Sequence, residues 1–247
     1  MVLDVLSGTI LNAITVAIGA TIGLVAATQV SARLQESLTT ALGLFTLVLA
    51  ASMGLQVFQD PTARPEHSLA VLGGLLLGVA VGEWLGLHDR FEALGGWFQR
   101  RLARGERPSR VAEAFVTTSL IFCVGPLTIL GSLENGLRGD ITLLATKSLL
   151  DGVGSVAFAA ALGPGVYLSI LTILVVQGGI ALGASFVAGF FDDVTILILT
   201  STAGIILIGV GLRLLDLKQV RLANFLPGLL LAPLLIRLFD AARAAMP

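Results

Sequence analysis

The chain has 247 residues, of which 55% are hydrophobic and 13% are charged, and its formal net charge is −1. Soluble domains carry about 25% charged residues, so this composition and the mean hydropathy of +0.95 exclude an ordinary soluble enzyme and predict an integral membrane protein. At about 20 residues for each membrane-spanning helix, the length allows about seven or eight spans and no separate soluble domain. The near-neutral charge gives no reason to expect nucleic acid as a partner.

The long apolar runs lack the period-2 alternation of a membrane β-barrel, so we predict an all-α polytopic bundle. Residues 1–247 are expected to form a single transmembrane domain. Its eight candidate spans, separated by short polar breaks, are 6–28, 38–58, 68–87, 112–132, 142–163, 165–189, 193–215 and 222–240. The fourth and fifth of these could instead be broken or re-entrant helices.

The segment before the first span predicts how the chain enters the membrane. It contains Asp4 and no Lys or Arg, so it lacks the positive region of a cleaved signal peptide, and we expect the N-terminus outside. The Arg-rich connection 88–111 then lies in the cytoplasm, as the positive-inside rule predicts for a protein of the bacterial inner membrane. Its apolar residues at helical spacing predict a helix on the membrane surface, either a lipid contact or a solvated linker: Phe91, Leu94, Phe98 and Leu102.

Weak internal similarity indicates a duplication of three helices. Three earlier segments match three later ones in the same order: 18–26 with 177–185, 41–48 with 202–209, and 68–87 with 221–239. We therefore expect a first repeat (6–87), the linker 88–111, a central polar hairpin (112–163) and a second repeat (165–240). Matched helices are five crossings apart, so the repeats are predicted to be inverted, as in many secondary transporters.

Gly74, Gly78 and Gly82 form a stripe of small residues along the third span. Such a stripe lets helix backbones approach closely, either within one subunit or between two. Because so small a bundle needs further walls to enclose a path, we expect a homodimer.

Asp151 is the most informative polar residue, because it lies inside the fifth span, roughly 14 Å from Thr142 at about 1.5 Å per residue. A charge at the bilayer centre costs about 2.5–3.5 kcal/mol, so it requires a partner or a water-filled cavity. Lys147, one turn earlier, could simply neutralise it. Alternatively, Asp151 faces a cavity and holds a proton, a sodium ion or a cationic substrate group, with Ser148 and Ser155 on the same face.

Gly125 and Pro126 interrupt the fourth span, where proline lacks a backbone donor and frees a carbonyl. Freed carbonyls and the hydroxyls of Thr128 and Ser132 are suitable ligands for a hard cation, so a monovalent cation could bind these hydroxyls and Asp151. The alternative is an ordinary proline kink whose free groups are satisfied by neighbouring helices.

Asn12 in the first span and Gln177 in the sixth are amides inside apolar runs. Such amides either bond to neighbouring helices or belong to the same site. The full set of candidate substrate- or ion-binding residues is Asp151, Ser148, Ser155, Gly125, Thr128, Ser132, Asn12, Gln177 and Lys147. Polar residues around the fourth connection would form the mouth of the cavity, or merely a wet loop: Glu134, Asn135, Arg138, Asp140 and Lys147.

Enzyme motifs such as HExxH, GxSxG or a P-loop lysine are absent from the sequence. Intramembrane aspartyl chemistry needs two facing carboxylates, whereas only Asp151 is deep. Cys123 is the single cysteine and lies in an apolar run, so we predict a small buried hydrophobe, no intrachain disulfide and no cysteine metal cluster. We therefore expect no enzyme activity and no cofactor.

Parts of the sequence resemble a known family of bacterial multi-pass membrane proteins. The stretches "GTILNAITVAIGATIGL", "CVGPLTILGSLENGLRGDITLLATKSLLDGVGSVAFAAALGPGVYLS" and "QGG" are similar to the family of unknown function 554, the YqgA/YdfK-like proteins. The resemblance covers nearly the whole chain and is most specific from Cys123 to Gly165. The family pattern is matched by Cys123, Val124 and Gly125, by Gly131 and Ser132, by Gly139 and Asp140, and by Lys147, Ser148, Leu150, Asp151 and Gly152. Pro126 departs from it, since a small residue before a methionine is expected there.

Members of that family are described as transport proteins with no known substrate, so the resemblance implies a multi-pass fold and a transport role. We predict a secondary transporter of a small solute or ion, with Asp151 as the ion- or proton-coupling carboxylate near the midplane. Expected partners are membrane lipids, a second copy of the chain, and a small solute, cation or proton. The alternatives are a passive channel and a non-transporting structural or partner subunit.

Overall fold

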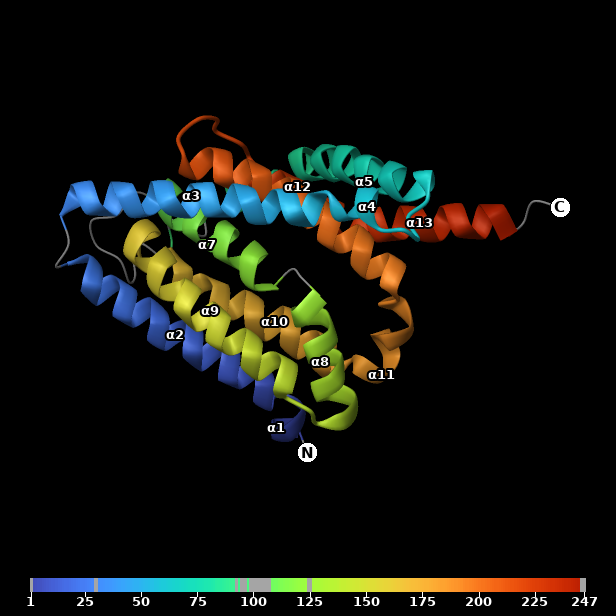
Figure 1. Ribbon diagram of the computed structural model, residues 1–247, viewed down its shortest axis with the longest axis horizontal. Helices are drawn as coiled ribbons and strands as arrows, with labels where there is room; N and C mark the ends of the chain where they lie inside the picture. The colour runs from blue at the N-terminus through green and yellow to red at the C-terminus, as the bar shows by residue number, and fades with distance from the viewer. Residues whose placement is uncertain are drawn as a thin grey trace. The chain divides into compact units, whose positions relative to one another are not determined.

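The computed structural model describes residues 2–28, 31–91, 93, 97, 108–123 and 126–244. These residues form helices and no strand, which confirms the predicted all-α class (Figure 1). The elements are α1 (Val2–Val5), α2 (Ser7–Ala27), α3 (Ala32–Gly54), α4 (Gln56–Gln59), α5 (Pro65–Trp84), α7 (Pro108–Cys123), α8 (Pro126–Arg138), α9 (Thr142–Leu162), η1 (Pro164–Tyr167), α10 (Leu168–Leu182), α11 (Ala184–Val187), η2 (Ala188–Phe190), α12 (Asp193–Leu214), η3 (Leu222–Phe225) and α13 (Gly228–Ala244).

Seven helical segments of the described residues are long and apolar enough to cross a membrane. They correspond to all the predicted spans except the fourth. In place of the straight span 112–132 the structure has two helices, α7 and α8, which are bent by 60° relative to each other. The fourth span is therefore broken or re-entrant, as its alternative predicted, whereas the fifth span is the continuous helix α9.

Local sequence signals explain several helix ends. Pro65 and Pro126 are the first residues of α5 and α8, a position where the missing N–H of proline has no intrahelical partner to lose. Asp192 caps α12, because its Oδ1 accepts from the backbone N–H of Thr195 at 2.8 Å. Gly163 ends α9 with φ of 83°, in the left-handed region that glycine adopts without strain.

The chain forms two compact units. Unit 1 comprises Met1–Leu42 and Phe91–Phe190, and unit 2 comprises Gly43–Arg90 and Phe191–Pro247. Each predicted repeat contributes to both units: the first helices, α2 and α10, belong to unit 1, and the third helices, α5 and α13, belong to unit 2.

In unit 1, α2 and α9 lie side by side along most of their length (Figure 1). Glycines of α2 make this possible: a methyl group added at Gly19 would overlap Ser155 Oγ and Gly152 O, and one at Gly23 would overlap Val156 O. Since the backbones touch at these points, the side chains of α2 and α9 in the adjoining turns are held at close range.

A second contact in unit 1 joins α7 to η1 and α10. Val111, Phe115 and Leu168 form a buried apolar cluster, and the ring of Phe91 stacks on Phe115 with centroids 5.4 Å apart. Phe91 belongs to the predicted surface helix. The other apolar residues of that prediction, Leu94, Phe98 and Leu102, lie outside the described residues.

In unit 2, α5 packs against η3 and α13 through the glycine stripe predicted from the sequence. The facing positions are Gly74 with Ala232, Gly78 with Gly228, and Gly82 with Asn224. The stripe is thus used within the subunit, where any side chain larger than hydrogen would meet the backbone of the opposite helix.

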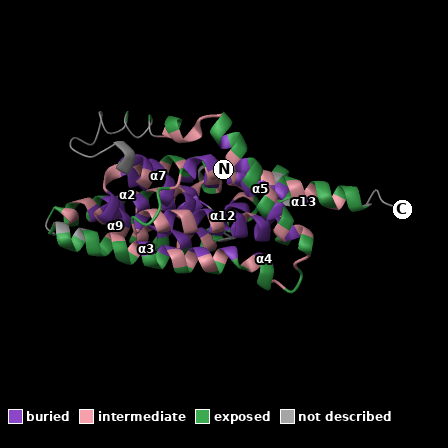
Figure 2. Ribbon diagram, turned by 90° about the horizontal axis from the view of Figure 1, so that it is seen from above, coloured by how far each residue is buried: buried purple, intermediate pink, exposed green. Residues whose placement is uncertain are grey.

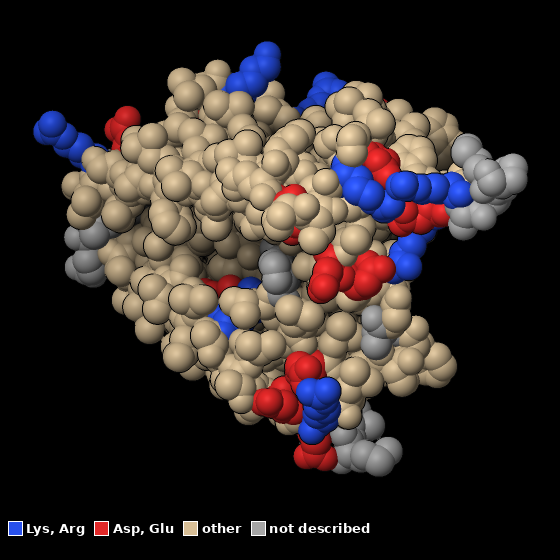
Figure 3. All heavy atoms as spheres, turned by 45° about the vertical axis from the view of Figure 1, so that its right-hand side comes forward, with Lys and Arg blue, Asp and Glu red and all other residues tan. Residues whose placement is uncertain are grey.

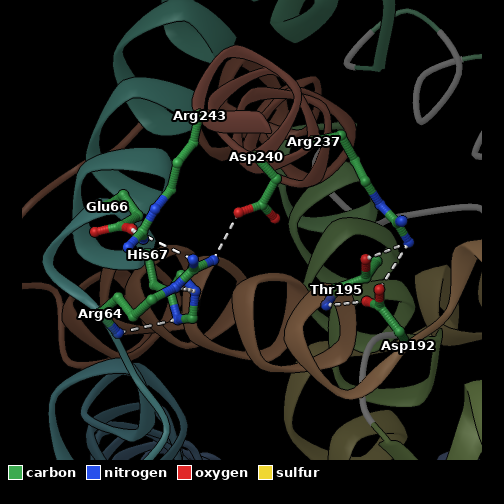
Figure 4. A network of polar contacts seen from close by, with 8 residues as sticks. All are labelled: Arg64, Glu66, His67, Asp192, Thr195, Arg237, Asp240 and Arg243. Atoms are coloured by element: carbon green, nitrogen blue, oxygen red, sulfur yellow. Dashed lines mark hydrogen bonds and ion pairs between the residues drawn. The ribbon is translucent and has the colours of Figure 1, made fainter. Parts of the chain in front are cut away.

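Charged side chains of unit 2 form contacts among the start of α5, the start of α12 and the second half of α13 (Figure 4). The ion pairs join Arg64 to Asp240 at 2.7 Å, Arg243 to Glu66 at 3.0 Å, and Arg237 to Asp192 at 3.0 Å. The buried ring of His67 lies within 3.2 Å of Arg64 Nε. These charged side chains are partly exposed, and exposed ion pairs add little stability.

The outward faces of the helices are apolar. Trp84, Val153 and Phe186 are each more than 70% exposed, and Figure 2 shows exposed residues along the outer sides of helices whose inner sides are buried. In Figure 3 the charged residues gather in a few groups, and most of the visible surface is made of uncharged residues. Apolar side chains on the outside of helices are suited to contact with lipid.

Candidate functional site

A buried ion pair occupies the middle of α9. Lys147 Nζ lies 2.9 Å from Asp151 Oδ1 and 2.7 Å from Oδ2, and 7% of each side chain is exposed. Asp151 is the only buried carboxylate among the side chains that the structure describes. Lys147 and Asp151 thus form an ion pair, and the two residues four apart share one helix face.

Asn12 reaches the ion pair from α2. Its Nδ2 donates to Asp151 Oδ2 at 2.9 Å. Because a carboxylate only accepts hydrogen bonds, this contact fixes the orientation of the amide and leaves its Oδ1 as a free acceptor. Asn12 Oδ1 is buried and has no partner among the described residues.

The serines beside Asp151 bond to their own helix. Ser148 Oγ donates to Leu144 O at 2.6 Å, and Ser155 Oγ donates to Gly152 O at 2.7 Å. Both hydroxyls are buried, and their protons are used by the backbone one turn earlier. Their oxygens can still accept, so these serines can contribute lone pairs to a ligand but no donor.

The break between α7 and α8 brings a hydroxyl to a helix end. Thr128 Oγ1 donates to Phe122 O at 3.2 Å, which satisfies one of the carbonyls that a helix terminus leaves unpaired. That carbonyl thus accepts one hydrogen bond and keeps its second lone pair. Gly125 lies outside the described residues.

Two further candidates are buried without partners. Ser132 Oγ on α8 and both amide atoms of Gln177 on α10 have no hydrogen-bond partner among the described residues, and both side chains are 0% exposed. Leaving a buried polar group unpaired costs roughly 1–3 kcal/mol. These residues are therefore not explained by the packing of their helices alone.

The predicted polar mouth is partly wrong. Asn135 is 0% exposed and joins α8 to the start of α2: its Oδ1 accepts from Gly8 N at 3.1 Å, and its Nδ2 donates to Asp4 O at 3.0 Å. Lys147, assigned to the same mouth, is buried in the ion pair. The signal for Asn135 was its spacing of three from Ser132, which puts both on neighbouring positions of one helix face.

The rest of that connection is exposed. Arg138 and Glu134 pair at 3.1 Å on the surface of α8. Asp140 Oδ1 accepts from Thr142 N at 2.8 Å, and this hydrogen bond lowers the pKa of the Asp140 carboxyl. These three charged residues are thus used in local contacts around the start of α9.

Cys123, at the end of α7, is a buried free thiol with 5% of its surface exposed. A buried thiol reacts slowly with maleimides, so we expect labelling of the folded protein to be at least about tenfold slower than after denaturation. Fluorescence of a maleimide dye measures this rate. In the variant Cys123→Ala/Gln219→Cys, whose new thiol lies at an exposed position, labelling should be fast in both states; equal rates for Cys123 would contradict its burial.

Comparison with known proteins places the whole chain in context. The sequence model of the family "Protein of unknown function (DUF554)" matches residues 7–237. The chain is 30% identical over 234 residues to "Uncharacterized membrane protein YdfK" of Bacillus subtilis (strain 168), covering 95% of this chain and 97% of that one. It is 26% identical over 225 residues to "Uncharacterized protein YqgA" of Escherichia coli (strain K12), covering 91% and 94%. No solved structure matches the chain.

Proposed function

The chain belongs to the DUF554 family of proteins of unknown function, and on that premise we propose that it is a secondary carrier of a small solute or ion across the membrane. The observation that carries the proposal is the buried site made by Lys147, Asp151 and Asn12. Asp151 is the tenth residue of the 21-residue helix α9, close to the middle of a span. We assign it the role of the coupling carboxylate.

Stability does not account for this site. Removing two charges from water is costly, and replacing a buried ion pair by apolar residues is often neutral or stabilising. The ion pair is therefore not required for the folding of a membrane helix. A transport role explains the buried charges if the ion pair opens to bind a solute or to exchange a proton. Charged residues inside the membrane are typical of transport paths.

The inverted duplication is supported by the way in which matched helices of unit 2 pair. The motif shared by α5 and α13 puts Gly74 in the position of Gly228, and Gly78 in the position of Ala232. Gly74 faces Ala232, while Gly78 faces Gly228. Exchanging each residue for its counterpart in the other helix therefore turns the first contact into the second. This is the pattern of an interface related by a two-fold axis.

The helices α3 and α12 show the same reciprocity. The sequence match puts Gly43 in the position of Gly204, and the same offset puts Gly54 in the position of Leu215. Gly43 faces Leu215, and Gly54 faces Gly204. Two independent helix pairs therefore have contacts that are exchanged when each residue is replaced by its counterpart. This shared pattern favours a duplication over chance similarity of glycine-rich sequences.

The first matched pair, α2 and α10 of unit 1, is also antiparallel. Thr21, near the end of α2, bonds to Tyr167 at 2.7 Å, just before α10 begins. Gly178, near the end of α10, faces Leu6 and Thr9 at the start of α2. Inverted halves have two conformations of similar energy, and exchanging them turns a midplane site from one side of the membrane to the other.

Reconstitution into liposomes tests the proposal. Uptake of a panel of protons, sodium, amino acids and polyamines is measured for the wild type, Asp151→Asn and the control Glu134→Gln, which changes an exposed carboxylate of α8. We expect saturable uptake of at least one solute, stimulated by the same solute inside. Asp151→Asn should lower it by at least about tenfold, and Glu134→Gln should leave it unchanged.

Two other results would contradict a carrier. A conductance that does not saturate and is not stimulated from the opposite side would indicate a passive channel. No uptake of any solute by either the wild type or Asp151→Asn would indicate a subunit that transports nothing itself, and a search for a partner protein would follow.

A further inference from the structure

Buried polar atoms without a hydrogen-bond partner among the described residues lie on four helices of unit 1: α2, α7, α8 and α10. Apart from the hydroxyl of Thr117 on α7, they are the hydroxyls of Thr9 and Ser132, Oδ1 of Asn12 and the whole amide of Gln177. Each of these residues is at most 1% exposed. Buried polar groups in folded proteins are nearly always paired with protein, ordered water or a ligand, so a group of such atoms points to partners other than the described residues.

Contacts along α10 place Gln177 beside the second half of the broken helix. Thr172 bonds to Ser119 of α7 at 2.9 Å, whereas Ala181 touches Gly136 of α8. The helix α10 therefore follows α7 and then α8 in the same direction, and Gln177 lies between these two contacts.

Ser132 on α8 lies one helical turn before the contact of α8 with α10, as Gln177 does on α10. It precedes Gly136 by four residues on α8, and Gln177 precedes Ala181 by four residues on α10. Residues four apart share a helix face. Because Gly136 and Ala181 touch, the turns that carry Ser132 and Gln177 adjoin as well.

The start of α2 forms the third wall. A Cβ at Gly178, next to Gln177, would lie 3.8 Å from Thr9 Cγ2. Thr9 and Asn12 are three residues apart and share one face of α2, and Asn12 bonds to Asp151. The four residues with unpaired atoms on α2, α8 and α10 therefore belong to three helices that pack against one another, beside the ion pair of α9.

The unpaired atoms specify the hydrogen bonds that a ligand must make. Asn12 Oδ1 and Gln177 Oε1 only accept, Gln177 Nε2 only donates, and the two hydroxyls do either. A bare cation would leave Gln177 Nε2 unpaired, and a bare anion would leave the amide oxygens unpaired. A solute that has both donors and acceptors satisfies all of them.

Charge gives the second constraint. The Lys147–Asp151 pair beside the junction of α2, α8 and α10 has no net charge, so a charged solute would be buried without a counter-charge. We propose that the junction of α2, α8 and α10 binds a small solute of zero net charge with both hydrogen-bond donors and acceptors, either a zwitterion such as an α-amino acid or an uncharged amide or alcohol. This inference rests on the proposed carrier function and names the class of its substrate.

Thermal unfolding of the full chain in detergent tests the inference with probes of similar size. Glycine, serine, acetamide and glycerol represent the expected class, and acetate, methylammonium and sodium ions represent charged solutes, all at one ionic strength. A ligand that binds the folded state raises the unfolding temperature with the logarithm of its concentration. We expect this response to at least one net-neutral probe; glycine and serine against acetamide and glycerol distinguish the zwitterion from the uncharged solute.

Variants connect the response to the junction. Gln177→Leu should raise the half-stabilising concentration by about tenfold or more, because it removes two hydrogen bonds. Ser132→Ala should raise it by several-fold. The matched control is Ser169→Ala, since Ser169 is buried on the same helix as Gln177 but donates to Val166 O at 2.7 Å, and it should leave the concentration unchanged.

The inference is overturned if no net-neutral probe stabilises the protein, or if only charged probes do. A charged probe whose effect disappears in Asp151→Asn would still support the carrier, so the two proposals fail separately. The unliganded protein provides a further check: Gln177→Leu should raise its unfolding temperature, because a buried amide without partners is replaced by an apolar side chain. A lower temperature would mean that the amide is bonded within the protein, and would also overturn the inference.

Discussion

Lys147→Met is expected to lower the free energy of unfolding by about 3–5 kcal/mol, because it leaves the Asp151 carboxylate buried and unpaired. Asp151→Asn alone should be destabilising for the converse reason, since it strands the ammonium of Lys147. The double variant Lys147→Met/Asp151→Asn removes both charges and should recover most of the loss. Unfolding in mixed micelles, followed by circular dichroism, measures the four states of this cycle.

A surface pair of the same spacing provides the control. Arg138 and Glu134 are also four residues apart, but 74% of the Arg138 side chain is exposed. Arg138→Met should change the free energy of unfolding by about 1 kcal/mol or less. If the two single losses at Lys147 and Asp151 simply added in the double variant, the charges would not interact, and the ion pair as described would be wrong.

The cycle also separates stability from function. The double variant should recover most of the stability of the wild type yet transport nothing, because the coupling carboxylate is gone. A double variant that retained the wild-type uptake would show that the ion pair belongs to the structure and not to the transport site.

Gly19→Ala is expected to destabilise the protein by about 1–3 kcal/mol, because the added methyl group would overlap atoms of α9. The atoms concerned are Ser155 Oγ and Gly152 O, so α2 must move away from α9. Because α2 carries Asn12, this movement should also break the 2.9 Å hydrogen bond to Asp151 and reduce uptake. Unfolding and uptake are measured on the same preparation.

The same substitution at Gly179 is the matched control. Gly179 lies within α10 of the same unit, and nothing lies within 4 Å of a Cβ added there. Gly179→Ala should be neutral or gain up to about 1 kcal/mol, since alanine favours the helix over glycine. Equal losses at Gly19 and Gly179 would mean that intrinsic helix preference, and not the contact between α2 and α9, decides the outcome.

Much of the fold followed from properties of single segments. The apolar runs predicted α2, α5, α9 and α12 to within a few residues, because hydropathy depends only on the residues of one helix. The break in the fourth span was signalled by Pro126, although the sequence did not decide between a kink and two helices. The 60° bend between α7 and α8 in the structure distinguishes two helices from a kinked single helix.

The candidate site was predicted only in part. The sequence showed that Lys147 and Asp151 share a face of α9, since their spacing of four is a local property. It left open whether they bond to each other. Asn135 was assigned to a polar mouth because its neighbours in the chain are charged, yet it is buried against α2.

The sequence by itself determined that this is a membrane protein, which segments are apolar enough to span, and where Asp151 lies along its helix, because each of these follows from hydropathy and helix period within one segment. Only the tertiary structure decided which polar atoms meet. Asn12 bonds to Asp151 across 139 residues of chain, whereas the amide of Gln177 is left without a partner. Partners of buried polar atoms are set by the packing of helices that are distant in the chain, and no local pattern records that packing.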